Sequence, residues 1–212
     1  MKITLFTSDQ LRHNYLINLL SNIAIKLYVI QESVYNNSND LSNNSHSSDL
    51  AKNYFLKVSN AQKKIFGDSF ILNNKKNINL LSLNNNTLND HSIDFFSDFL
   101  KSDIYIIFGS SYIKSDLANF LIKHQALNIH MGVSPYYRGT DCNFWALYDN
   151  NPHLVGATIH MLSKGLDSGP ILYHALSSIK KNSFEYTMST VKSAFQSLAE
   201  RIKNESIFNF KP

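Results

Sequence analysis

KITLFTSDQLRHNYLINLLSNIAIKLYVI, which spans residues 2–30, decides the fold class. Residues 2–7 form an apolar, partly β-branched run, and residues 11–20 carry apolar side chains at helical spacing. Residues 23–30 are again apolar and β-branched, so the pattern predicts a strand, a helix and a second strand joined by short connections. Such units build parallel sheets. We therefore expect an α/β fold with a doubly wound, mostly parallel sheet.

The remaining sequence continues this alternation of helical and extended patterns. Apolar periodicity predicts four further helices, at residues 50–66, 90–100, 114–123 and about 184–203. Gly67 is expected to end the first of them. Apolar runs predict strands at residues 103–108, 126–130, 155–162 and 171–179, with one or two short strands within 68–89. Residues 36–48 (NNSNDLSNNSHSS) are polar and of low complexity, so we expect a loop and assign it no chemistry.

Length and composition indicate one domain. The 212 residues include 43% hydrophobic residues, enough to bury one core, and no internal repeat or linker divides them. We expect residues 1–180 to form the α/β unit that carries the site. Residues 181–212 are expected to add a helix and a tail packed on the same domain.

Charge and cysteine content narrow the function classes. The net charge is +4, but the lysines are scattered among asparagines, which makes a nucleic-acid partner unlikely and suits an anionic small molecule. Cys142 is the only cysteine, so an internal disulfide framework and a thiolate zinc cluster are both excluded. No signal peptide precedes the first strand, and no apolar run reaches the roughly 20 residues of a membrane span. We expect a cytoplasmic protein with no membrane partner.

The polar residues most suited to chemistry begin in the predicted strand 126–130. Residues two apart in a strand point to the same side, so Asn128 and His130 should project together where the strand ends. Ligands of open parallel sheets bind at that edge. The alternative is an amide and an imidazole that only satisfy backbone groups there.

A second polar group follows the predicted strand 155–162. Asp167 lies in a loop between Gly165 and Gly169, whose backbone can approach a ligand closely. An aspartate in such a loop is often only a turn former. Together with Asn128 and His130, however, it can complete a cluster of an amide, an imidazole and a carboxylate.

The motifs around these residues occur in an order that resembles a known family, the folate-dependent formyltransferases. The matching segments are Asn128-Ile129-His130, Ser134-Pro135-Tyr136-Tyr137-Arg138-Gly139, Gly156-Ala157-Thr158-Ile159-His160 and Leu166-Asp167-Ser168-Gly169-Pro170-Ile171. The family includes methionyl-tRNA formyltransferase, glycinamide ribonucleotide formyltransferase and the sugar N-formyltransferases. The resemblance is sharpest over residues 103–172.

This resemblance implies a Rossmann-like formyltransferase fold and an enzyme that moves a formyl group from 10-formyltetrahydrofolate, its co-substrate, to an amine without a metal. It implies a catalytic triplet of Asn128, His130 and Asp167. It also implies a set of residues that hold the pterin of the folate, namely Phe108, Gly109, Tyr112, Ile113, Leu162, Gly165 and Leu166.

Formyl transfer explains why these groups are needed. Attack of a neutral amine on the formyl carbon gives a tetrahedral intermediate whose oxygen is negative, and Asn128 and His130 can donate hydrogen bonds to that oxygen. Asp167 would orient the imidazole and favour its charged form. Which group serves as the general base stays open.

The acceptor is inferred from departures from the better-known family members. Residues 7–13 (TSDQLRH) contain no glycine that could wrap a phosphate, which disfavours glycinamide ribonucleotide. The chain ends at residue 212, without the additional barrel that helps methionyl-tRNA formyltransferase to hold tRNA. We expect the acceptor to be the amino group of a nucleotide-linked aminodeoxy sugar used for surface polysaccharide (O-antigen). The expected substrate-binding residues are Arg12, His13, Tyr137 and Arg138. Tyr136, Tyr137, Phe144 or Trp145 could stack on the sugar or the base, with core packing of Phe144 and Trp145 in a short helix as the alternative, which is preferred for Trp145.

Several alternatives remain. The acceptor can be methionyl-tRNA or another amine, and a 10-formyltetrahydrofolate hydrolase would use nearly the same triplet. A non-catalytic folate-binding protein would be expected to have a broken triplet. A dinucleotide-binding module would need Gly-x-Gly-x-x-Gly after the first strand, and the sequence lacks it. A homodimer is also open, because many sugar-modifying relatives dimerise.

Overall fold

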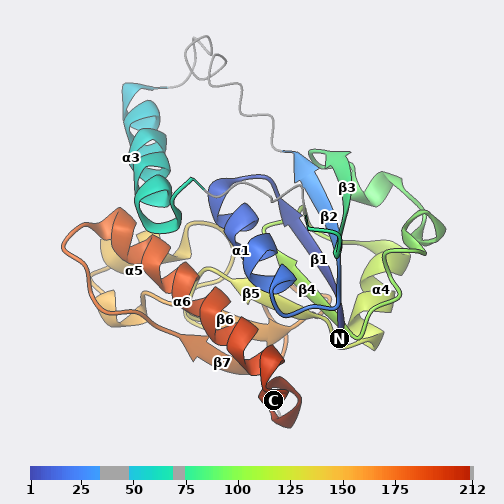
Figure 1. Ribbon diagram of the computed structural model, residues 1–212. Coiled ribbons are helices and arrows are strands. Elements are labelled where there is room, and N and C mark those ends of the chain that lie inside the picture. Colours follow the sequence, from blue (N-terminus) through green and yellow to red (C-terminus); the bar gives the residue numbers. More distant parts are fainter. Residues whose placement is uncertain (34–47, 69–74, 211–212) are drawn as a thin grey trace.

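A computed structural model describes residues 1–33, 48–68 and 75–210 of the chain. Their seven strands form one sheet in the order β3-β2-β1-β4-β5-β6-β7 (Figure 1). The strands are β1 (Lys2–Ser8), β2 (Lys26–Ser33), β3 (Ile78–Asn84), β4 (Ile104–Phe108), β5 (Leu127–His130), β6 (Ala157–Met161) and β7 (Ile171–Ala175). The pairs β3-β2, β2-β1, β1-β4 and β4-β5 are parallel, whereas the pairs β5-β6 and β6-β7 are antiparallel. The expected doubly wound, mostly parallel α/β sheet is therefore confirmed.

Helices cover both faces of the sheet (Figure 1). One face carries α1 (Leu11–Ser21), α3 (Asp49–Phe66) and α6 (Ser183–Lys203), and the other carries α4 (Ser115–Lys123) with the 3-10 turns η1 (Leu88–Asp90) and η2 (Ile93–Phe96). The shorter elements are α5 (Cys142–Tyr148), η3 (Pro152–Leu154) and η4 (Ser206–Asn209). None of the helices in the described ranges is long and apolar enough to cross a membrane.

Alternation along the central strand divides the core into two layers. Leu5 of β1 packs under α1 and α6, whereas the next residue, Phe6, packs under α4. Phe195 of α6 is fully buried in the first layer, so this helix shares its core with β1 and β4. Figure 1 shows α3 lying against α6 and projecting away from the sheet.

Three sequence-based expectations need correction, and one is that the last strand, predicted over residues 171–179, ends at Ala175 as β7. The second strand begins at Lys26 rather than at residue 23, because the N–H of Ala24 still bonds the carbonyl of Leu20 at the end of α1. Residues 90–100 do not form an α-helix. The backbone of Ser92 is extended there, which separates η1 from η2. The predicted helix at 50–66 is present as α3 and ends at Gly67, which has φ 68°.

Two other expectations concern the asparagine-rich segments. Of the predicted loop 36–48, residues 36–47 lie outside the described residues. Ser48 is described and is the N-cap of α3, because its hydroxyl accepts from the N–H of Ala51. Within 68–89, one strand, β3, lies in the described part of the segment.

The short strand β5 positions the polar residues. Its pairing with β4 places Asn128 level with Ile107, so His130 extends past the last residue of β4. β1 and β4 adjoin at the centre of the sheet, and from there the chain proceeds to β2 on one side and to β5 on the other. A ligand crevice is expected at the carboxyl ends of strands at such a switch point.

Candidate active site

A cavity of about 1170 Å³ occupies this switch point. Its floor includes the ends of β1 and β4, at Ser8 and Phe108, together with Asn128 and His130 of β5. The loops after β1, β4 and β6 form its walls, with α5 and the start of α6. The polar residues singled out in the sequence therefore lie together in the lining of one cavity.

Asn128, His130 and Asp167 meet in this cavity. The Nδ2 atom of Asn128 donates to Oδ1 of Asp167 at 3.1 Å, and Nδ1 of His130 lies 3.2 Å from Oδ2. The side chains of His130 and Asp167 are only 5% and 12% exposed. The spatial convergence that the sequence predicted is present. The catalytic role of the three residues stays a prediction.

Asp167 reaches the cluster by a route that the sequence did not show. Strand β6 is antiparallel to β5, so its last residue, Met161, lies beside Leu127 and not beside His130. The loop turns back over β5, with Asp167 in the left-handed region at φ 43°. Gly169 is required in this turn, because a Cβ there would overlap the carbonyl oxygen of Met161.

Backbone groups fix the charged partners. The N–H of Gly139, a residue at φ 91°, donates to Oδ2 of Asp167 at 3.0 Å. The carbonyl of Tyr137 accepts from Nε2 of His130 at 2.9 Å. Both bonds come from the Arg138-Gly139 part of the loop that follows β5, so this loop positions the imidazole and the carboxylate together.

The environment tunes both ionisable groups. Burial tends to raise the pKa of Asp167, but hydrogen bonds and charge interactions with His160, His130 and the N–H of Gly139 outweigh it and lower the pKa. Burial lowers the pKa of His130 below its ordinary value, and Asp167 and the carbonyl of Tyr137 offset only part of that effect. Asp167 is therefore a carboxylate, and its charge supports a proton on the imidazole beside it.

His160 is a fourth member that the predicted site did not include. Its Nδ1 must donate to the carbonyl of Met161, 2.8 Å away, so in the neutral ring Nε2 accepts from Nδ2 of Asn128 at 2.9 Å. Both N–H bonds of the Asn128 amide are thereby used, one by His160 and one by Asp167. Donation to a substrate oxygen requires that one of these two bonds be exchanged. The signal for His160 was in the sequence, because Gly-x-Thr-x-His pairs in register with Asn-x-His.

Thr158 holds the start of the loop after β5. Its hydroxyl donates to the carbonyl of Gly132 at 2.6 Å and accepts from the N–H of Ser134 at 2.9 Å. A Cβ at Gly132 would lie 2.6 Å from Nε2 of His130, so the close approach of this loop to the imidazole needs a glycine.

The residues predicted to hold the pterin all line one part of the cavity; they are Phe108, Gly109, Tyr112, Ile113, Leu162, Gly165 and Leu166. The Tyr112 hydroxyl donates to the carbonyl of Lys164 at 2.6 Å, which joins the loops after β4 and β6. We call this part of the cavity, where the formyl donor is predicted to bind, the donor end. The ring of Phe108 packs on His13 and Phe195 in the core. Folate binding by this set stays a prediction.

Comparison with known proteins decides the family. The sequence profile described as Formyl transferase matches residues 33–206, which is most of the chain. The chain belongs to this formyl transferase family. Members of the family use 10-formyltetrahydrofolate as the formyl donor.

The curated relatives match over short stretches. Methionyl-tRNA formyltransferase from Thermodesulfovibrio yellowstonii is 37% identical over 67 residues, which is 32% of this chain and 21% of that protein. The same enzyme from Thermosynechococcus vestitus is 30% identical over 73 residues, or 34% of this chain and 22% of its own length. The matches therefore span about a fifth of the curated relatives.

Solved structures of the family share the fold. A sugar N-formyltransferase from Shewanella sp FDAARGOS_354 has a TM-score of 0.60 at 15% identity, covering 100% of this chain and 72% of that one. Phosphoribosylglycinamide formyltransferase from Anaplasma phagocytophilum has a TM-score of 0.59 at 17% identity, covering 96% and 85%. A 4-N formyltransferase from Francisella tularensis has a TM-score of 0.56 at 18% identity, covering 99% and 71%. These likenesses show the formyltransferase fold and do not choose among acceptors.

A buried glutamate supports the donor end of this family member. Glu32, at the end of β2, is 2% exposed, and its carboxylate accepts from the N–H of Ser111 at 2.6 Å and from its hydroxyl at 2.9 Å. Asn89 adds bonds to the carbonyl of Tyr112 and the N–H of Lys114, both at 2.8 Å. The loop after β4 is thus fixed from behind. Sequence reasoning missed Glu32, because 79 residues separate it from Ser111.

The predicted substrate-binding residues separate into two groups. Arg12 lines the cavity, and its Nε is buried without a hydrogen-bond partner among the described residues. Burial lowers the pKa of Arg12 to about 10, partly offset by the negative charge of Asp141. Arg138 is exposed and is not among the residues that line the cavity. The geometry favours Arg12 over Arg138 as an anion ligand.

His13 and Tyr137 are placed differently from the prediction. His13 is 1% exposed, its Nδ1 lies 2.8 Å from the hydroxyl of Thr7, and burial holds its pKa well below the ordinary value. A neutral imidazole packed in the wall is not a cationic phosphate ligand. The Tyr137 hydroxyl donates to Asp149 at 3.0 Å, and its ring packs outside the cavity.

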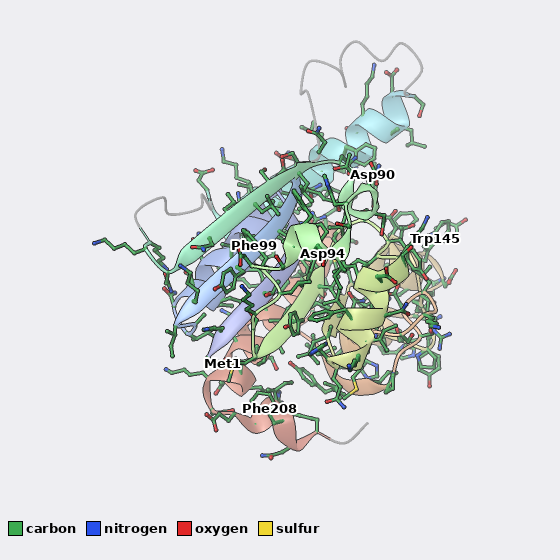
Figure 2. All side chains as sticks on the ribbon, turned by 90° about the vertical axis from the view of Figure 1, so that its right-hand side faces the viewer. Met1, Asp90, Asp94, Phe99, Trp145 and Phe208 are labelled. Atoms are coloured by element: carbon green, nitrogen blue, oxygen red, sulfur yellow. The ribbon has the colours of Figure 1, made fainter. Side chains whose placement is uncertain are left out.

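The expectation that Trp145 packs in the core is wrong, and Phe144 does not pack there either. They are 40% and 48% exposed on α5, whose buried side consists of Cys142, Asn143 and Ala146. Figure 2 shows Trp145 at the edge of the molecule. Phe144 lines the cavity. Among the described residues, no group of three histidine, cysteine, aspartate or glutamate side chains could hold a metal ion.

Proposed function

We propose that this chain transfers a formyl group from 10-formyltetrahydrofolate to the primary amine of a nucleotide-linked aminodeoxy sugar destined for surface polysaccharide. The cluster of Asn128, His130 and Asp167 carries the proposal, because it lies between two ends of one cavity. The donor end is apolar and bounded by two loops. The other end holds Arg12.

The size of the cavity supports two substrates. Its volume of about 1170 Å³ exceeds that of a typical site for one drug-sized ligand, roughly 300–1,000 Å³. When bound, 10-formyltetrahydrofolate supplies the formyl carbon. Ile113 and Leu162 offer apolar walls for a flat ring, and the bond from Tyr112 to Lys164 keeps their loops together.

The residues of the cluster divide the work of the transfer. With a proton on both ring nitrogens, His130 can donate to the formyl oxygen as that oxygen becomes negative, by exchanging the bond from its Nε2 to the carbonyl of Tyr137. The Asn128 amide adds a second donor by exchanging its bond to His160. The carboxylate of Asp167, 3.2 Å from His130, can take the proton released by the attacking amine and return it to the tetrahydrofolate nitrogen that leaves.

The choice of acceptor rests on Arg12. A guanidinium in the cavity lining suits a phosphate group, which offers several acceptor oxygens to one side chain. A nucleotide-linked sugar carries such phosphates and places its amine at some distance from them. Methionyl-tRNA is the second candidate, because both curated relatives bear that enzyme's name.

The direct test incubates the full chain with 10-formyltetrahydrofolate and one acceptor at a time, from a panel of nucleotide-linked amino sugars and methionyl-tRNA. Tetrahydrofolate release and the formylated product are both measured. We expect release and product with one sugar only. Equal release in the absence of any acceptor would identify a hydrolase, and product with methionyl-tRNA alone would replace the sugar by the second candidate.

A further inference from the structure

Four aromatic side chains form a feature that the formyl-transfer cluster does not use. Tyr54 of α3, Phe144 and Tyr148 of α5 and Phe184 of α6 all line the cavity, and we call this group the aromatic recess. Tyr54 packs edge-on against Phe144 and Phe184, with ring centroids 5.9 and 5.6 Å apart. Rings from three helices therefore converge on one part of the cavity wall.

The rings of α5 are not explained by core packing. Phe144 and Tyr148 are 40% and 70% exposed, although aromatic rings are normally stabilised by burial. They are four residues apart, one turn along α5, and their planes differ by only 20° with centroids 6.1 Å apart. Two nearly parallel rings with open faces offer a surface for a flat ligand.

The recess is connected to the part of the cavity wall that holds Arg12. The hydroxyl of Tyr54 donates to Asp141 at 3.0 Å, and the charge of Asp141 acts on Arg12. Asp141 follows Gly139 by two residues, and Gly139 bonds the carboxylate of Asp167. Arg12, Asp141 and the recess therefore belong to the lining of the same cavity as the reacting groups.

We propose that the aromatic recess binds the base of a nucleoside diphosphate whose phosphates bind at Arg12. This assignment rests on the proposed function for the statement that the acceptor is nucleotide-linked, but it concerns binding and does not require transfer. A planar ring and an anion, held at a distance from the amine, are the two features that the recess and Arg12 recognise. The rings of α3 and α5 therefore determine which nucleotide-linked acceptor the site selects.

A nucleotide fits these observations better than a polynucleotide. Of the cationic side chains in the described lining, Lys114 and Lys164 lie in the loops after β4 and β6, and Arg12 has the negative charge of Asp141 near it, whereas nucleic-acid sites follow the backbone with a row of cations. The scattered lysines of the chain do not supply such a stripe. A tRNA end that stacks in the recess is therefore an outcome of the test and not part of the proposal.

The test measures binding by calorimetry with the full chain, without folate. The probes are uridine, thymidine, guanosine and adenosine diphosphates, with inorganic pyrophosphate as the probe that lacks a base. We expect at least one nucleoside diphosphate to bind more tightly than pyrophosphate. Tyr148→Ala should weaken that binding by about 5- to 150-fold, the range for losing one base-stacking ring, and leave pyrophosphate binding unchanged.

The matched control is Tyr136→Ala. Tyr136 is also 70% exposed, but it is not among the residues that line the cavity, so its loss should leave every affinity unchanged. Arg12→Gln should weaken the diphosphates and pyrophosphate alike, and Arg12→Lys should restore part of both.

Three results would overturn the recess assignment. They are equal affinity for pyrophosphate and every nucleoside diphosphate, equal effects of the Tyr148 and Tyr136 variants, and binding of a short RNA ending in adenosine when no diphosphate binds. Failure of the proposed function looks different. Nucleotide binding that depends on Tyr148, with no formylated product from any nucleotide-linked sugar, would keep the recess and reject the transfer.

Discussion

Asp167 organises the site at the scale of single residues. Its two oxygens receive donors from Asn128, His130 and the backbone of Gly139, so the carboxylate is fully coordinated before any substrate binds. Such preorganised groups lower the barrier because little rearrangement is needed when charge develops.

The first prediction concerns this carboxylate. Asp167→Asn keeps the shape of the side chain and removes its charge, so the imidazole loses the partner that raises its pKa. We expect kcat to fall on the order of 100-fold or more, with KM for both substrates nearly unchanged. Steady-state kinetics and a circular dichroism spectrum check this. A kcat within a factor of about three of the parent would remove the charge of Asp167 from the mechanism.

The second prediction concerns acid stability. Burial holds the pKa of His13 well below 6.5, so the folded state keeps this ring neutral while the unfolded chain binds a proton. The stability contributed by the neutral ring is complete above pH 6.5 and is lost as the pH falls below it. We expect the free energy of unfolding to drop by up to about 1.4 kcal/mol per pH unit from this group.

Urea titrations between pH 8 and pH 5 measure this drop, with His13→Gln as the comparison. The variant should be less stable at pH 8 and show a smaller loss on acidification. His153, which is exposed, gives the control, because His153→Gln should leave the slope unchanged. Equal slopes for the parent and His13→Gln would contradict the prediction.

At the scale of elements, the loop after β4 owes its position to the end of β2. Glu32 accepts from the N–H and the hydroxyl of Ser111. Asn89 bonds the carbonyl of Tyr112 and the N–H of Lys114 in the same loop. A buried carboxylate with three donors, including the N–H of Leu88 at 3.4 Å, fixes a loop that lacks regular structure of its own.

The third prediction follows from this anchor. Glu32→Gln replaces a charge-assisted bond and turns one acceptor into a donor, so the loop loses its fixed position at the donor end. We expect KM for the folate to rise about 5- to 20-fold, KM for the acceptor to change little and kcat to fall less than KM rises. Glu200→Gln on the exposed side of α6 is the control. A rise in the acceptor KM alone would show that the loop serves the other substrate.

Elements also show what the sequence could and could not predict. Strong apolar periodicity located β1, β4, α3 and α6, and the period of two placed Asn128 and His130 on one side of β5. The antiparallel direction of β6 was not visible, because a buried strand has the same composition in either direction. Leu88 and Phe96 are buried at a spacing that an α-helix would also give, but they belong to two 3-10 turns.

Contacts between distant segments were the other limit. Nothing near Glu32 in the sequence marks it as the partner of Ser111, and the exposed rings of α5 resemble the apolar side of a packed helix. The motif containing His160 was visible, but its bond to Asn128 depends on the pairing of β5 with β6. Local patterns thus located the groups, and their partners required the folded chain.

At the scale of the whole molecule, the site lies where both core layers end. Leu162 and Ile113 belong to the layer under α4, while Met188 of α6 belongs to the other layer and also borders the cavity. A ligand that fills the cavity therefore contacts both halves of the core and should stabilise the domain as a unit.

The fourth prediction measures this coupling. Tetrahydrofolate at about 100 times its Kd should raise the free energy of unfolding by about 2.7 kcal/mol. Each kcal/mol corresponds to about 2–4 °C in Tm for a domain of this size. Thermal unfolding with and without ligand gives the shift, and Glu32→Gln should need a higher concentration for the same shift. An unchanged Tm at millimolar tetrahydrofolate would exclude the donor end as a folate site.

The ten residues from His130 to Gly139 close a ring of bonds, since Nε2 of His130 donates to the carbonyl of Tyr137 and the N–H of Gly139 donates to the carboxylate that faces the same imidazole. Only main-chain atoms of the loop take part, so substitutions at Tyr136 or Arg138 leave the ring intact. An inserted or deleted residue would break both of its closures together. Over evolutionary time exposed positions such as Tyr136 and Arg138 can vary in composition, while Gly132 and the length of the segment stay constrained.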